Sequence, residues 1–319
     1  MTDSTPLVIE TKGLSKTYGE IRALQSLDLT VRGNSTTGFL GPRGAGKSTA
    51  IKLLLGLIHP TEGSGRIFGM DITRESTAIR RRVGYLPQHA TFYPYLTARE
   101  TLRFVARFLS TDPHRIETRV KASLAFVGLM DKADRSVGGF SDGERQRLGL
   151  AQALIHQPDL VILDEPAAAL DPMERAHVLD IIERLRGRST IFYSTHVLDD
   201  VQRVSDRVVI LNDGRLIAQG PIADFLTDDT GVVYHVTLRG APVSAYRRVK
   251  AQPWVTQIAT TERNDVFEWH VAVTDERAAT HQLLRLVLAD EQTDVLDFGR
   301  SDDALARVIL QGVNETTDG

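Results

Sequence analysis

The sequence predicts an α/β protein with a smaller α+β domain behind it, and three patterns carry this prediction. Apolar runs alternate with amphipathic stretches as far as about residue 226, which is typical of helices layered on a sheet. Residues 160–163 are apolar without alternation, as in a parallel strand that is buried on both faces. The polar segment 227–231 then indicates a linker, so the expected domains are 1–226 and 232–319.

Periodicity places the individual elements of the larger domain. Strands are expected where short runs of apolar and β-branched residues occur, and helices where apolar residues recur every 3.6 residues. The elements expected are strands at 7–11, 27–31, 36–40, 160–163, 190–193 and 208–211, a helix beginning near Gly46, and helices over 114–129 and 141–156. Strands and helices therefore alternate along this part of the chain.

The smaller domain has its own pattern. The expected order is strand 233–239, helix 243–251, strand 254–260, strand 266–273, helix 276–289, strand 294–298 and a last helix. This βαββαβ order resembles a ferredoxin-like module. The segment lacks a glycine-rich loop and a cluster of metal-ligating residues. We therefore expect it to fold separately and to regulate or dimerise the protein without contributing to its chemistry.

Composition excludes several classes of function. The 319 residues include 38 basic and 41 acidic side chains, and a net charge of -3 gives no electrostatic basis for binding nucleic acid. The absence of cysteine excludes disulfides, thiol catalysis and cysteine-ligated metals, and fits a reducing cytoplasm. The sequence shows no secretory signal and no run of about 18 apolar residues. If the protein serves a membrane process, another chain is expected to cross the membrane.

A glycine-rich segment at residues 41–48 predicts a nucleotide site, because it follows an apolar strand and opens a helix. Phosphates need backbone N–H groups that can approach closely, and glycines together with a helix N-terminus provide them. Lys47 is expected to reach the β- and γ-phosphates, and the Ser48 hydroxyl to bind Mg²⁺. The residues expected at this site are Gly41, Pro42, Arg43, Gly44, Ala45, Gly46, Lys47, Ser48 and Thr49.

Two acidic residues follow the predicted buried strand at 160–163. The carboxyl end of a parallel strand is where α/β sheets bind ligands. Asp164 is placed to hold Mg²⁺, directly or through water, and Glu165 to polarise an attacking water. The pair indicates hydrolysis rather than binding alone; the alternative is two ordinary acids before a turn.

These motifs resemble the ATP-binding subunits of ABC transporters over roughly residues 7–226, in the same order. The resemblance implies that Tyr18 stacks on adenine and that Gln88 touches Mg²⁺ or water and relays to a membrane partner. It implies that His196 contacts the γ-phosphate and that Asp171 belongs to the loop that couples two sites of a dimer. Taken singly, Tyr18, Gln88 and His196 have ordinary structural interpretations, and Asp171 also fits a helix N-cap.

The family's signature segment departs from its usual pattern in this chain. Ser141 and Gly143 match it and would approach a γ-phosphate, whereas Asp142 stands where glycine is usual. Ser141 and Glu144 also form the pattern of a capping box, so a helix is expected to start here whatever its function. Arg43 likewise replaces the asparagine that is common in the phosphate loop.

The resemblance implies a P-loop ABC ATPase cassette with a helical subdomain at about 89–157. It implies ATP and Mg²⁺ as ligands, and two cassettes arranged head to tail around ATP, either two copies of this chain or one with a related subunit. It also implies a membrane-spanning permease that holds the protein on the inner, cytoplasmic face of the membrane, most like the bacterial branch that exports drugs, ions or polysaccharides.

Two other functions stay open at this point. A nucleotide-binding regulator that hydrolyses poorly is suggested only by the altered signature. An ABC ATPase of translation or DNA repair normally has tandem cassettes or coiled-coil insertions, and neither is evident here. The segment 89–96, with three aromatic residues and a proline, is expected to dock the permease; its alternative use is packing within the helical subdomain.

Overall fold

The computed structural model describes residues 6–109, 113–225, 232–263, 266–289 and 293–301. The chain divides into two compact units between Ile222 and Ala223. The expected linker at 227–231 and the last expected helix, beyond 301, lie outside the described residues. The described residues contain no helix that is long and apolar enough to span a bilayer.

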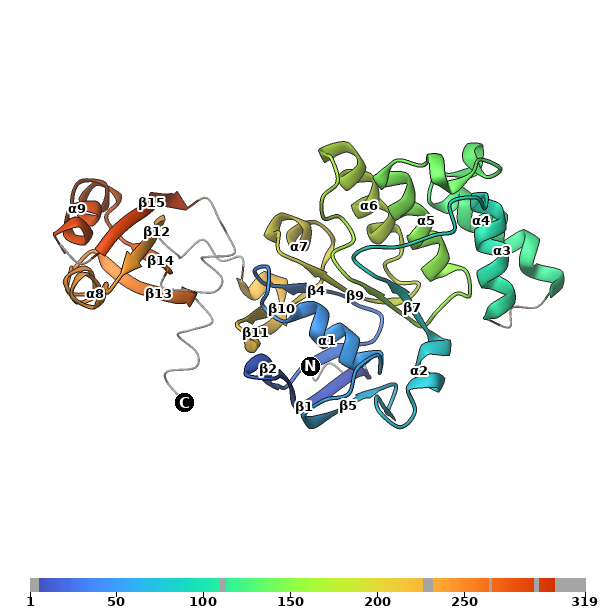
Figure 1. The fold of residues 1–319 in the computed structure, drawn as a ribbon, viewed down its shortest axis with the longest axis horizontal. Helices are drawn as coiled ribbons and strands as arrows, with labels where there is room; N and C mark the ends of the chain where they lie inside the picture. The colour runs from blue at the N-terminus through green and yellow to red at the C-terminus, as the bar shows by residue number, and fades with distance from the viewer. Residues whose placement is uncertain (1–5, 110–112, 226–231, 264–265, 290–292, 302–319) are drawn as a thin grey trace. The chain divides into compact units, whose positions relative to one another are not determined.

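A six-stranded sheet forms the centre of the first unit, in the order β11-β10-β4-β9-β8-β7 (Figure 1). Its strands are β4 (Thr36–Leu40), β7 (Val83–Leu86), β8 (Leu160–Leu163), β9 (Thr190–Thr195), β10 (Arg207–Asn212) and β11 (Arg215–Pro221). All neighbouring pairs are parallel except β10 and β11, which form an antiparallel hairpin.

The burial of β8 explains why its sequence does not alternate between apolar and polar residues. Leu160 and Ile162 pack into one hydrophobic core together with helix α1 (Lys47–Leu54), while Val161 and Leu163 pack into a second core on the other face. All four side chains are fully buried. The sheet is therefore covered on both sides, as predicted for parallel strands.

The N-terminal strands form a separate antiparallel sheet against α1. It contains β1 (Leu7–Tyr18), β2 (Ile21–Leu27), β3 (Thr30–Arg32), β5 (Glu62–Ile67) and β6 (Met70–Asp71), and α2 (Ser76–Arg82) follows it. The predicted continuous strand at 27–31 was wrong. The Thr11 hydroxyl donates to Leu27 O at 2.7 Å and accepts from Leu29 N–H at 2.8 Å, and thereby takes the place of strand pairing at Asp28.

Between β7 and β8 the regular elements of the described residues are helices, joined by loops. This part contains α3 (Ala98–Phe108), α4 (Ile116–Phe126) and α5 (Asp142–Leu154), with short 3-10 turns η1 (Pro113–Arg115), η2 (Met130–Lys132) and η3 (Val137–Gly139). They gather at one end of the first unit (Figure 1). The remaining helices of this unit are α6 (Pro172–Arg184) and α7 (Leu198–Val204), and the 3-10 turn η4 (Ile222–Phe225) spans the division between the two units.

The second unit has the ferredoxin-like arrangement that its sequence predicted. Its elements are β12 (Val232–Gly240), α8 (Val243–Lys250), β13 (Val255–Arg263), β14 (Val266–Val273), α9 (Glu276–Leu288) and β15 (Thr293–Ser301). The sheet order is β13-β14-β12-β15, and every pair is antiparallel. Trp269, Val236 and Leu283 are buried in its own core, contributed by two strands and α9.

Candidate active site

Four neighbouring strands of the central sheet end at one edge, and each is followed by a predicted motif. In sheet order, β4 leads into the phosphate loop, β9 into His196, β8 into Asp164 and Glu165, and β7 into Gln88. Because parallel strands present their carboxyl ends together, motifs more than 100 residues apart in sequence meet at this edge.

The phosphate loop has no room for larger residues at two of its glycines. A Cβ on Gly41 would lie 2.2 Å from Leu211 O, and a Cβ on Gly46 would lie 2.4 Å from Ala23 O. Gly46 also has a φ of 102°, which favours glycine, and it directly precedes α1. The loop is therefore held tightly at the N-terminus of α1, where backbone N–H groups and the helix dipole favour an anion.

Lys47 is buried among acceptors and is only 5% exposed. Its ammonium donates to Gly41 O at 2.7 Å and to Pro42 O at 3.0 Å, and it pairs with Glu165 Oε1 at 3.1 Å. Burial lowers the pKa of Lys47 from its ordinary value of 10.5, and the nearby Glu165 carboxylate opposes that shift. A phosphate group at this loop would offer the ammonium a more highly charged partner than Glu165.

Asp164 and Ser48 provide a set of oxygen atoms suited to Mg²⁺. The Ser48 hydroxyl donates to Asp164 Oδ1 at 3.1 Å, and Asp164 is 2% exposed. Within the described ranges, no cluster of three or more His, Asp or Glu side chains could hold a metal unaided. Mg²⁺ commonly takes one or two protein oxygens and completes its shell with phosphate and water, so the Ser48 hydroxyl and the Asp164 carboxylate suit this ion.

Glu165 lies between the phosphate loop and His196. Its Oε1 pairs with Lys47, and its Oε2 lies 2.8 Å from His196 Nδ1. The residue is 7% exposed and has a φ of 49°, a left-handed conformation that is uncommon for a non-glycine residue. Such strain persists where surrounding contacts fix the geometry, and it is concentrated at functional sites.

Ser194 is a functional residue that sequence reasoning missed. Its hydroxyl donates to Asp164 Oδ1 at 2.7 Å and accepts from the backbone N–H of Glu165 at 2.8 Å. It therefore fixes both acids from the neighbouring strand β9. The available signal was a hydroxyl near the end of a fully buried strand, because a buried polar group requires a hydrogen-bond partner.

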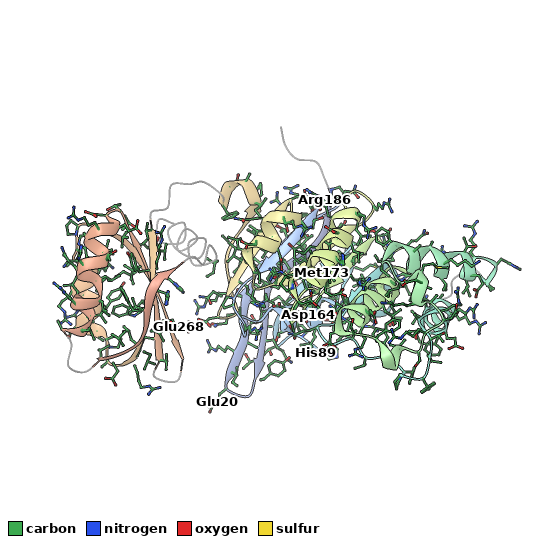
Figure 2. The ribbon with its side chains drawn as sticks, turned by 90° about the horizontal axis from the view of Figure 1, so that it is seen from above. Glu20, His89, Asp164, Met173, Arg186 and Glu268 are labelled. Carbon is green, nitrogen blue, oxygen red and sulfur yellow. The ribbon has the colours of Figure 1, made fainter. Side chains whose placement is uncertain are left out.

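A cavity of about 760 Å³ opens beside these residues. Gly44, Lys47, Ser48, Gln88 and Glu165 are among the residues that line it, and Asp142 and Arg145 from the first turn of α5 also reach it. Figure 2 labels Asp164 within the first unit and His89, a further residue of the cavity wall. We call this cavity the nucleotide groove.

Several predicted site residues are not part of this wall, among them Tyr18 and Asp171. Tyr18 ends β1, is 46% exposed, and has the Lys16 ammonium 5.1 Å from its ring centroid. Asp171 caps α6 by accepting from the backbone N–H groups of Met173 and Glu174, at 3.0 and 2.9 Å. The capping interpretation of Asp171 is therefore confirmed, whereas its coupling role and adenine stacking by Tyr18 stay predictions.

The altered signature keeps the expected helix start. The Ser141 hydroxyl accepts from Glu144 N–H at 3.2 Å, and Glu144 Oε2 accepts from Ser141 N–H at 3.0 Å, which confirms the capping box. A Cβ on Gly143 would lie 2.3 Å from the Glu174 carboxyl carbon, so a larger residue here would have to displace the end of the Glu174 side chain. Asp142 forms an exposed ion pair with Arg145 at 2.9 Å.

The loop after Gln88 uses its aromatic residues in two ways. Phe92 is half-buried against the core of the helical part, which is the alternative use that the sequence left open. Tyr93 and Tyr95 are 55% and 71% exposed, and their ring centroids lie 5.7 Å apart. The Tyr93 ring also meets the exposed Phe104 of α3 edge-on. We call Tyr93, Tyr95 and Phe104 the aromatic patch.

Comparison with known proteins identifies close sequence relatives. The family model described as ABC transporter matches residues 24–168. The daunorubicin/doxorubicin resistance ATP-binding protein DrrA of Streptomyces peucetius is 36% identical over 251 residues, 78% of this chain and 76% of that protein. The Nod factor export ATP-binding protein I of Burkholderia lata is 37% identical over 213 residues, 66% of this chain and 70% of that protein.

A solved structure shares the fold of the first unit. It is described as the dimeric post-hydrolysis state of the ATP-binding cassette MJ0796 bound to ADP and phosphate. It aligns with a TM-score of 0.62 at 27% identity, and the alignment covers 67% of this chain and 98% of the other.

Proposed function

The chain belongs to the family of ABC transporter ATP-binding proteins, and from this premise we propose that it is the ATP-hydrolysing motor subunit of a membrane exporter. It is an ATPase of the P-loop ABC type. The observation that carries the proposal is the position of Glu165, which contacts Lys47 through one carboxylate oxygen and His196 through the other.

The geometry supports Glu165 as the residue that activates water. When ATP enters, its phosphates compete for the Lys47 ammonium, which otherwise holds Glu165 Oε1. That oxygen is then released to accept a hydrogen bond from a water aligned with the γ-phosphate, while His196 keeps Oε2 in place. Bound Mg²⁺ held by Ser48, Asp164 and Gln88 would neutralise charge on the phosphates.

The alternative of a weakly hydrolysing regulator rests on Asp142. Its carboxylate is balanced by Arg145, and the helix beneath it begins with an intact capping box. The departure is therefore compatible with a regularly capped start of α5 at the signature, which favours the motor. Steady-state ATPase measurement separates the two: a motor turns over ATP continuously, whereas a regulator binds ATP with negligible phosphate release.

We further propose that two cassettes close head to tail, with Ser141 of one subunit facing the phosphate loop of the other. The structural relative is a dimeric cassette with bound nucleotide products, which supports a dimer. Lys47→Ala removes function from one half of a composite site, and Ser141→Arg from the other half. A mixture of the two variants retains one intact site per heterodimer, so ATP-dependent dimerisation should return; a mixture no better than either variant alone would contradict the arrangement.

The proposed partner is a permease on the inner face of the membrane, docked on the aromatic patch. Exposed aromatic side chains clustered on a surface are favoured binding anchors. Export is proposed because the relative from Burkholderia lata is named for Nod factor export and DrrA for drug resistance. The double change Tyr93→Ala and Tyr95→Ala should reduce permease co-purification from solubilised membranes and leave ATP affinity unchanged.

The matched control for that experiment is Ile21→Ala, since Ile21 is 71% exposed and lies on β2, outside the aromatic patch. It should leave co-purification intact. Equal recovery of the permease with the aromatic double variant and with the control would remove the docking proposal.

A further inference from the structure

We propose that Arg43 of one subunit forms an ion pair with Asp142 of a second copy of this chain in the ATP-bound dimer. The inference rests on the head-to-tail arrangement proposed above. It names two residues that make the dimer selective for a second copy of this chain over a related subunit. Because an interface with two-fold symmetry places each contact twice, one such match gives two ion pairs per dimer.

Both residues are positioned to meet a partner. Arg43 is exposed on the phosphate loop, and Asp142 is exposed at the first turn of α5, with 83% of its side chain accessible. Both line the nucleotide groove, so both lie where a closing subunit would cover the site. Three positions in the two motifs carry a charge where the family's usual residue is neutral, namely Arg43, Asp142 and Glu144. Glu144 is buried and already pairs with Lys132 of the same subunit, so Arg43 and Asp142 are the two exposed replacements, and they are opposite in sign.

The existing partner of Asp142 does not prevent the exchange. Asp142 pairs with Arg145 three residues along the same helix, at 2.9 Å and in an exposed position. Such a surface pair is worth little, so its loss costs little when a second cation approaches. Arg145 also lines the groove and can remain beside Asp142.

The pair explains how a carboxylate is tolerated close to bound phosphate. In the proposed dimer, Asp142 approaches the phosphate loop of the other subunit next to Ser141, where its negative charge alone would oppose closure. A guanidinium at position 43 of that loop compensates this charge. A cassette with neutral residues at both positions would leave Asp142 uncompensated, so the pair favours a second copy of this chain over a related subunit.

Charge reversal tests whether the pair forms between subunits. In a Glu165→Gln background that retains ATP, Arg43→Glu gives two like-charged contacts per homodimer, and so does Asp142→Arg. In a heterodimer of these two variants, one contact joins the two substituted side chains, which again carry opposite charges, and the other contact keeps the native Arg43 and Asp142. Both contacts are then attractive. Pairing within a subunit would instead leave both subunits of that heterodimer mismatched.

The readout is the dimer dissociation constant from sedimentation, with ATP in large excess over the affinity measured for each variant, because position 43 adjoins the phosphates. Each single reversal should weaken dimerisation by at least about tenfold, and the mixture should return to within about threefold of the parent. Weakened single variants without rescue in the mixture would overturn the ion pair. If the Glu165→Gln parent fails to dimerise with ATP, the head-to-tail proposal and the ion pair both fall.

A second measurement does not depend on charge at the phosphate loop. The chain contains no cysteine, so Arg43→Cys and Asp142→Cys subunits can be mixed and treated with a short bis-maleimide. ATP should increase formation of the crosslinked dimer. Arg186→Cys replaces Asp142→Cys as the control, because Arg186 is exposed and is not part of the groove wall (Figure 2). Equal crosslinking of the two mixtures would contradict the proposal.

Discussion

Ser194→Ala tests whether the buried hydroxyl of β9 positions the two acids of the site. The Ser194 side chain is fully buried, donates to Asp164 Oδ1 at 2.7 Å and accepts from Glu165 N–H at 2.8 Å. Removing it deprives a carboxylate of one hydrogen bond and leaves a buried N–H without its acceptor. We therefore expect the free energy of unfolding to fall by about 2–4 kcal/mol.

The catalytic effect should exceed what lost stability alone produces. Glu165 has a φ of 49°, and its backbone N–H would no longer be fixed by β9. A displaced carboxylate aligns water poorly, so kcat should fall by about 10- to 100-fold while ATP affinity changes little. Urea unfolding gives the stability, and steady-state phosphate release at a temperature where the variant remains folded gives kcat.

Ser205→Ala is the matched control. Ser205 is also a buried serine, and its hydroxyl lies 2.7 Å from Tyr193 Oη, away from the two acids. It should lose about 1–2 kcal/mol of stability with kcat unchanged. If folded Ser194→Ala turned over ATP as fast as this control, the positioning role would be refuted.

Three further predictions address binding, pH and domain organisation. Lys47→Ala should weaken ATP binding at least about tenfold by calorimetry, because a buried cation beside the phosphates is lost; unchanged affinity would contradict the site. Burial raises the pKa of Tyr85 to about 12, so the folded protein resists ionisation and the free energy of unfolding should fall as pH rises above 10. Between pH 10 and 11, the free energy of unfolding of Tyr85→Phe should fall by up to about 1.4 kcal/mol less than that of the unmodified protein, as measured by urea unfolding. The same pH dependence in both proteins would contradict the role given to Tyr85. Truncation after Phe225 should leave a folded cassette that binds ATP, and a folded fragment without ATP binding would show that the second unit contributes to the site.

The motifs of the site could be predicted because their chemistry constrains sequence locally. Glycines at 41 and 46 are required by backbone atoms of Leu211 and Ala23. The apolar run at 160–163 required a strand covered on both faces, which placed Asp164 at a strand end. Likewise, the order of apolar segments after residue 231 was sufficient to predict the ferredoxin-like unit.

Other features depend on contacts between distant segments. The order β4-β9-β8-β7, which brings His196 beside Glu165, has no local signal. The interruption at Asp28 arises from the hydroxyl of Thr11, a residue on another strand. Phe92 and Tyr95 are both aromatic residues of the same loop, yet only Phe92 packs against the core of the helical part. None of these three features could be predicted without the three-dimensional structure.

The central claim is that Glu165 activates water in an ATP-hydrolysing cassette, and Glu165→Gln tests it most directly. Glutamine keeps the size of the side chain but removes the negative charge that Lys47 and His196 now contact. The measurement is steady-state phosphate release at saturating ATP, with ATP affinity determined on the same protein. We predict that turnover falls at least about 100-fold while ATP is still bound and the dimer accumulates. Turnover at the rate of the unmodified protein would contradict the account.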